Sequence, residues 1–167
     1  MRERHASQEA RRARDFEAFV AGAAGRLLHA ATLLTAETPD DNPRARRLLT
    51  LALAETYASW DRLRGDDPYD RTRQQLATRF AREAWHRHGT FGRQRRDRGG
   101  ILAGLSPRER LMLVLRLYEG VTEEQTGALL GLPTERVRAI CARAVATLLH
   151  PPPRPAPAVP VAKVAPS

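Results

Sequence analysis

Apolar residues recur at spacings of three and four along the first part of the chain, which is the period of an amphipathic α-helix. One such stripe runs from Asp15 to about Ala36, and a second runs from Arg44 to Leu63. Between them the stretch "TAETPDDNP" carries two prolines and polar turn formers, which end a helix. The stripes consist of Phe16, Phe19, Val20, Ala23, Leu27, Ala30 and Leu34, and of Ala45, Leu48, Leu49, Ala52, Thr56, Trp60 and Leu63. The pattern predicts two helices that pack through these faces.

A third helix is predicted after the turn "RGDDPYD", where Asp67 can cap the helix and Pro68 can occupy its first position. Its inward residues are Tyr69, Leu76, Phe80, Ala84 and Trp85. We therefore expect a three-helix domain over residues 15–88. Residues 1–14 form a basic N-terminal arm, predicted as either a helical extension or a disordered segment.

Two stretches lack the apolar positions that a packed element needs. Residues 89–100 are rich in glycine and arginine, which indicates a basic flexible linker, and "RQRRDR" within it can track a DNA backbone. Residues 151–167 are rich in proline and alanine, which indicates a disordered tail.

Residues 101–150 carry the signals of three helices in close succession. Ser106 with Glu109 and Thr122 with Gln125 have the spacing of capping boxes, and Gly120 and Gly131 can end the helices. A short helix, a glycine turn and a longer helix match a helix-turn-helix. With no strand pattern elsewhere, the fold class is all-α, with two small helical domains.

The last helix presents one apolar face and one small-residue face. Val137, Ile140, Cys141, Ala144 and Leu148 lie together, and Ala139 and Ala142 lie opposite, flanked by arginines. Small residues let a helix enter a major groove closely, and arginines reach phosphates or guanine edges. Thr134, predicted as the cap, begins the helix where base edges are usually met. The predicted DNA-binding set is Thr134, Glu135, Arg136, Arg138, Ala139, Ala142 and Arg143.

The net charge of +9 favours a polyanionic partner, and nearly every basic residue is arginine, although a GC-rich coding bias explains the arginine preference equally well. The single cysteine, Cys141, excludes a disulfide within the chain and fits a reducing cytoplasm. No signal peptide and no membrane-spanning helix are expected, so we predict a cytoplasmic protein without membrane insertion. No motif for catalysis or a cofactor is present. His86 and His88 are too poorly placed on a helix to predict a metal site.

The predicted C-terminal helices lie in the stretch "LSPRERLMLVLRLYEGVTEEQTGALLGLPTERVRAICARAVATLL". This stretch resembles region 4 of the extracytoplasmic-function sigma factors, the small two-domain members of the sigma-70 family. The resemblance implies a bacterial protein whose last helix contacts the upstream, minus-35 promoter element. Residues 15–90 resemble region 2 of the same family more weakly. That resemblance implies weaker contacts to the downstream, minus-10 element by Tyr69, Arg73, Arg79, Arg82 and Trp85.

One stretch departs from the family pattern. The family carries acidic residues before and within the second helix, on a surface that docks on RNA polymerase core. Here the corresponding residues are Arg44, Arg46, Arg47, Thr50 and Leu51, so the charge is inverted. Arginine facing a basic partner surface would repel it.

Three functions therefore stay open. The first is a sigma factor-like protein that directs RNA polymerase core to double-stranded promoter DNA, with an anti-sigma factor as a further partner. The second is a helix-turn-helix transcriptional regulator that has lost core docking, which the inverted charge favours. The third is a protein-interaction module that binds a regulatory partner, which weak, salt-insensitive DNA binding would indicate.

Overall fold

The computed structural model describes residues 2–63, 65–86 and 99–151, and this part of the chain is all-helical. Its α-helices are α1 (Arg2–Thr35), α2 (Pro43–Ala58), α3 (Pro68–His86), α4 (Pro107–Leu113), α5 (Glu123–Leu130) and α6 (Thr134–Leu149). A 3₁₀ turn, η1 (Trp60–Arg62), follows α2, and a π-helical segment, η2 (Val114–Tyr118), follows α4. The predicted all-α fold class is confirmed. The "RQRRDR" stretch, His88 and the tail from residue 152 lie outside the described residues.

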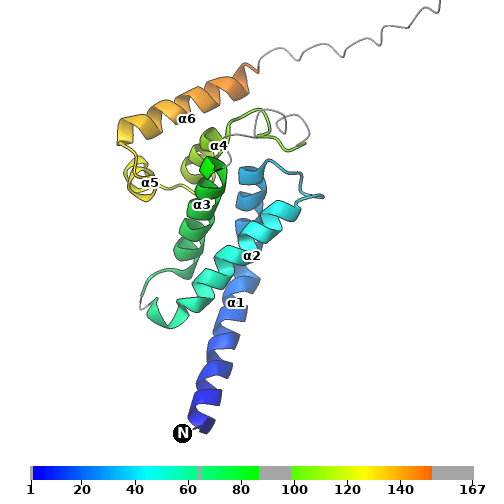
Figure 1. Ribbon diagram of the computed structural model, residues 1–167, viewed down its shortest axis with the longest axis vertical. Helices are drawn as coiled ribbons and strands as arrows, with labels where there is room; N and C mark the ends of the chain where they lie inside the picture. The colour runs from blue at the N-terminus through cyan, green and yellow to red at the C-terminus, as the bar shows by residue number, and fades with distance from the viewer. Residues whose placement is uncertain (1, 64, 87–98, 152–167) are drawn as a thin grey trace, which may run out of the picture.

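The first three helices pack through the apolar stripes that the sequence shows. Leu27 and Leu34 of α1, Leu48 of α2 and Leu76 and Phe80 of α3 are all buried. Figure 1 shows α2 and α3 lying alongside α1, while the N-terminal part of α1 extends beyond them. Helix α1 begins at Arg2, so of the two forms expected for the N-terminal arm, the structure shows the helical one over residues 2–14.

An aromatic cluster holds the extending part of α1 against the end of α2. The Phe16 ring lies 4.8 Å from that of Tyr57 and 5.1 Å from that of Trp60, the latter edge to face. Arg12 pairs with Asp61 at 3.1 Å and lies over the Tyr57 ring. The predicted second helix was too long, because α2 ends at Ala58 and the η1 turn places Trp60 against Phe16.

The predicted start of α3 is confirmed, since the Asp67 carboxylate accepts the backbone N–H of Tyr69 at 2.9 Å and Pro68 opens the helix.

By length and composition alone, His5–Thr35 could cross a membrane, contrary to the expectation from sequence. A buried core helix passes the same test. Here Leu27, Ala30 and Leu34 pack in the protein core.

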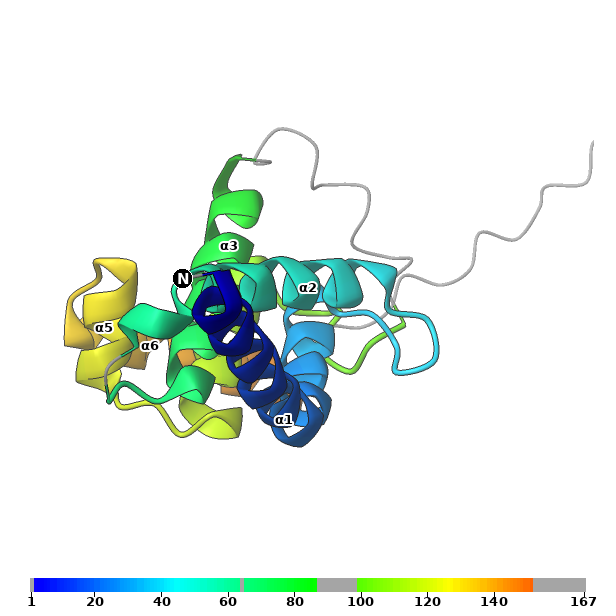
Figure 2. The same ribbon diagram turned by 90° about the horizontal axis from the view of Figure 1, so that it is seen from below.

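One hydrophobic core joins the two halves of the chain. Leu105, Leu111 and Leu115 from the C-terminal half belong to the same buried cluster as Leu27 and Leu76. A smaller cluster of Met112, Val137 and Ile140 lies beneath α6. Helix α6 lies across one end of the molecule, with α4 and α5 beside it and the N-terminus of α1 at the far end (Figures 1 and 2). The predicted division into separate domains remains a prediction.

A buried guanidinium from the C-terminal half binds the end of α1. Arg110 is 3% exposed, and its Nε donates to the carbonyl of Leu34 at 2.8 Å. Its Nη1 donates to the carbonyl of Leu105 at the same distance. Because the last carbonyls of a helix have no partner within the helix and lie at its negative end, a cation is the fitting cap there.

A buried carboxylate from the C-terminal half forms a second link. The side chain of Glu119 is only 1% exposed. The Tyr69 hydroxyl donates to its oxygens at 3.0 Å, and Arg26 and Arg73 lie 3.7 and 3.9 Å from Oε2. Glu119 therefore ties the end of η2 to both α1 and α3.

We expect Arg110→Ala to lower the free energy of unfolding by about 2–4 kcal/mol, because it orphans two buried carbonyls and leaves a cavity. Denaturant unfolding of the full chain measures this. The exposed Arg47 provides the control, since Arg47→Ala removes the same charge and should change stability by less than about 0.5 kcal/mol. Equal losses in the two variants would mean that the buried contacts of Arg110 contribute nothing.

We expect stability to fall with rising pH above about 10, in part through Tyr69. Burial, with the Glu119 hydrogen bond and charge, raises the pKa of Tyr69 above its usual 10.0. Above that pH the unfolded tyrosine ionises while the folded one stays protonated, so unfolding is favoured. Tyr69→Phe should therefore flatten the fall in the unfolding midpoint between about pH 9 and about pH 11. An unchanged pH dependence would exclude Tyr69 as a source.

Candidate nucleic-acid interface

Both predicted capping boxes are present and fix the helices that carry α6. The Glu109 carboxylate accepts the backbone N–H of Ser106 at 2.8 Å, and the Ser106 hydroxyl accepts that of Glu109 at 3.3 Å. Thr122 and Gln125 make the corresponding pair at 3.2 and 3.1 Å. These reciprocal bonds satisfy the backbone N–H groups of the two cap residues and of the third residue in each of α4 and α5.

The turn between α5 and α6 depends on two glycines. Gly131 has φ of +66°, in the left-handed region that glycine adopts without strain. At Gly127 a Cβ atom would lie 2.5 Å from the carbonyl oxygen of Leu132, so no larger residue fits while the turn stays this close. Helix α6 then begins at Thr134, three residues after Gly131. This is the geometry of a helix-turn-helix.

The expected cap of α6 was wrong in one respect. Pro133 is the N-cap residue and Thr134 is the first helical residue, with no side-chain hydrogen bond at the cap. Because Pro133 has the extended conformation of a cap, with φ of −61° and ψ of +146°, the helix starts at Thr134, one residue earlier than a Thr134 cap would give.

The apolar face of α6 packs inward largely as predicted. Val137, Ile140 and Ala144 are buried, and Cys141 is half-buried. Burial raises the pKa of the Cys141 thiol, which keeps it in its less reactive neutral form at neutral pH. Leu148 was expected on this face but is 41% exposed, and Val145 packs against the core in its place.

The opposite face of α6 is open to solvent. Ala139 and Ala142 are exposed, and so are all the charged members of the predicted set: Glu135, Arg136, Arg138 and Arg143. Thr134 is half-exposed. All residues of the predicted upstream set belong to α6, which lies at one end of the molecule (Figure 1). That these residues contact DNA remains a prediction.

Two of the three arginines on this face are paired with carboxylates of neighbouring helices. Arg138 donates to Glu123 of α5, and Arg143 lies 3.4 Å from Oε1 of Glu109 in α4. Arg136 has no carboxylate partner among the described residues. Sequence reasoning missed both carboxylates, because nothing in the spacing shows that residues fifteen or more positions away lie beside these arginines.

The predicted downstream set does not form one free surface. Tyr69 and Arg73 point to Glu119 of the C-terminal half. In this arrangement their polar groups already have protein partners, so a nucleic acid would have to displace those contacts.

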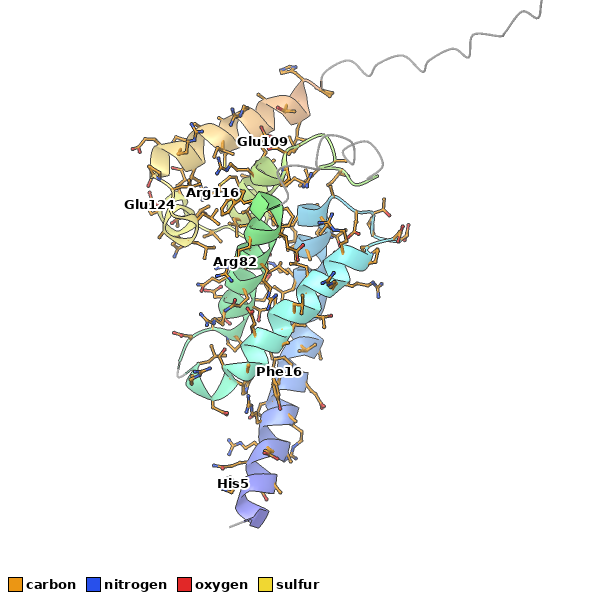
Figure 3. The ribbon with its side chains drawn as sticks, in the orientation of Figure 1. His5, Phe16, Arg82, Glu109, Arg116 and Glu124 are labelled. Carbon is orange, nitrogen blue, oxygen red and sulfur yellow. The ribbon has the colours of Figure 1, made fainter. Side chains whose placement is uncertain are left out.

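The remaining downstream residues differ in their surroundings. Arg79 pairs with Glu55 of α2, and Trp85 lies beneath the guanidinium of Arg108 at 5.6 Å. Arg82 is exposed on α3, where Figure 3 shows its side chain directed outward. Among these three residues, only Arg82 presents an exposed charge.

The arginines at the start of α2 lie on the surface without carboxylate partners among the described residues. Arg46 and Arg47 are exposed and Arg44 is half-exposed. Arg46 Nε donates to the amide oxygen of Asn42 at 2.8 Å, which leaves its charge uncompensated. Thr50 is exposed and Leu51 half-exposed on the same helix.

A single carboxylate caps α2, and it is directed at the backbone. Glu37 accepts the N–H groups of Arg44 and Ala45 at 3.1 and 2.8 Å. Its carboxylate satisfies these two N–H groups in the first turn of α2, and the positive end of the helix dipole favours a negative charge there. The exposed surface at the start of α2 therefore keeps the positive charge predicted from the sequence.

No cluster of three or more His, Cys, Asp or Glu residues in the described ranges could hold a metal ion.

Comparison with known proteins gives one finding for this surface. Residues 101–150 match the family model Sigma-70, region 4, which covers less than a third of the chain and contains the whole α4–α6 segment. No curated protein and no solved structure was found to match. The matched family consists of non-enzymatic transcription factors. Residues 101–150, which fold as a helix-turn-helix, are thus similar to sigma-70 region 4.

Proposed function

We propose that this protein is a sigma factor-like protein that binds double-stranded promoter DNA through α6 and directs RNA polymerase core to it. The observation that carries the proposal is the exposed outer face of α6, with small residues at its centre and arginines at its sides, in a segment that matches sigma-70 region 4. Region 4 segments act in general with promoter DNA and RNA polymerase.

The side chains on this face of α6 suit a DNA major groove. The short side chains of Ala139 and Ala142 project little from α6, so the helix backbone can approach base edges. Glu135, in the first turn, stands where a recognition helix meets base edges. The arginines flanking the alanines can reach phosphates or guanine edges on either side. Such an interface needs no cofactor, and it fits the predicted cytoplasmic location.

A second candidate function is a DNA-binding transcriptional regulator that does not load polymerase. The uncompensated arginines at the start of α2 favour it, because they stand where the resemblance implies an acidic surface for a basic part of the polymerase. The contacts of Tyr69 and Arg73 with Glu119 also favour it, because they occupy residues that a downstream promoter element would need.

We expect Arg136→Ala to weaken binding of the full chain to duplex DNA and to reduce the slope of log affinity against log salt by about one. Arg136 is exposed and has no carboxylate to release, so its whole charge is available to a phosphate. Arg62→Ala is the matched control, since Arg62 is an exposed arginine on η1, far from α6. Fluorescence anisotropy at several salt concentrations measures both. An unchanged slope in the Arg136 variant would place the DNA elsewhere.

Co-purification with RNA polymerase core separates the two candidates. If the protein is a sigma factor, the tagged wild type retains core, and its docking surface uses the arginines of α2. The matched variant Arg44→Asp/Arg46→Glu/Arg47→Asp should then lose core. If wild type fails and the acidic variant succeeds, the regulator that has lost core docking is the correct function.

A further inference from the structure

Arg138 of α6 forms two side-chain hydrogen bonds with Glu123 of α5. Arg138 Nε and Nη2 lie 3.1 and 2.8 Å from one oxygen, Oε2 of Glu123. Glu123 is the first residue of α5, fifteen positions earlier in the sequence. Its side chain is 21% exposed, whereas that of Arg138 is 62% exposed. The carboxylate is therefore held at the protein surface while the guanidinium extends from it towards solvent.

Glu123 also contacts a second arginine, which precedes α5 in the chain. Arg116 of η2 lies 3.8 Å from the other oxygen, Oε1, and also donates through Nη1 to the carbonyl of Val121. The first turn of a helix is also where a negative side chain is favoured by the helix dipole. Figure 3 shows Arg116 and the neighbouring Glu124 on this side of the molecule, where α5 meets the segment before it.

The geometry decides which donors of Arg138 remain available. A guanidinium has five N–H groups in a fixed planar fork. Glu123 accepts one from Nε and one from Nη2, on the same edge. The second N–H of Nη2 and both of Nη1 remain, and the remaining Nη2 N–H forms the end-on edge with one N–H of Nη1. Two parallel donors on that edge match the O6 and N7 acceptors of guanine.

The pairing also changes what Arg138 can do with phosphate. A guanidinium whose charge is already compensated by a carboxylate contributes less to counterion release than a free one. The hydrogen bond with Glu123 raises the pKa of Arg138. Arg136 has no such partner among the described residues. The two arginines are thus chemically different, although the sequence presents them as equivalent.

We infer that Glu123 is a positioning residue that orients Arg138 for a base contact, with guanine as the preferred base, and weakens its contact with phosphate. This inference rests on the proposed function, because it requires α6 to lie in the major groove. It assigns sequence discrimination to the Glu123–Arg138 pair and general phosphate affinity to Arg136.

The test begins by selecting preferred duplexes from a random library with the wild-type full chain. Affinities for a selected duplex and a scrambled one are then measured over a range of salt. Glu123→Gln should lower the ratio of selected to scrambled affinity by about fivefold or more, the discrimination of one bidentate base contact. It should also tighten binding to scrambled DNA and steepen the salt slope, by up to about one, because Arg138 gains freedom to contact phosphate.

Glu124→Gln is the matched control. Glu124 is an exposed carboxylate one position along α5, and this variant changes the net charge by the same amount without breaking the pair. It should leave the affinity ratio unchanged. Arg138→Lys keeps the charge but loses the fork, and it should lose discrimination as the Glu123 variant does. In an Arg138→Ala background, Glu123→Gln should have no further effect on the ratio.

The outcomes separate the two levels of the argument. If wild type enriches no duplex, the proposed function fails and the inference with it. If wild type enriches a sequence but Glu123→Gln and Glu124→Gln behave alike, α6 binds DNA and the positioning role is wrong. A loss of folding would weaken binding to scrambled DNA as well, so tighter scrambled binding by a variant with wild-type circular dichroism supports positioning.

Discussion

The fold depends on a cation buried between the two halves of the chain. Arg110 lies in α4 of the C-terminal half, yet it caps the last turn of α1 through the carbonyl of Leu34 and also binds that of Leu105. A buried charge is costly unless its hydrogen bonds are made, so this residue fixes α4 against α1 within narrow limits. Because α6 packs on α4 and α5, its position on the molecule follows from that contact.

A buried carboxylate, Glu119, forms a second link between the two halves of the chain. Glu119 accepts from Tyr69 and lies near Arg26 and Arg73, so α1 and α3 both engage the segment after α4. Residues that the family resemblance assigns to a downstream DNA element thus serve here in internal contacts. The outer face of α6, by contrast, keeps all its predicted charged residues exposed.

The outer face of α6 also shows how carboxylates of neighbouring helices divide a set of similar arginines. Glu109 and Glu123 lie in the first turns of α4 and α5, where helix dipoles favour them, and each lies beside one arginine of α6. Arg136 is left without such a partner among the described residues. The net positive charge of the chain describes its long-range attraction to a polyanion, whereas these pairs decide which guanidinium edges remain free at close range.

The sequence by itself determined the elements and their faces. Glycine and proline positions, the two capping boxes and the apolar period act within a few residues, so they predicted the helix-turn-helix, the start of α3 and the buried face of α6. It did not reveal the end of α2, where Trp60 turns back to meet Phe16 from a distant helix. Nor did it reveal the π-helical segment or the partners of Arg110, Glu119 and Arg138. These depend on groups brought together from far along the chain, and only the packed structure decides which charge lies beside which.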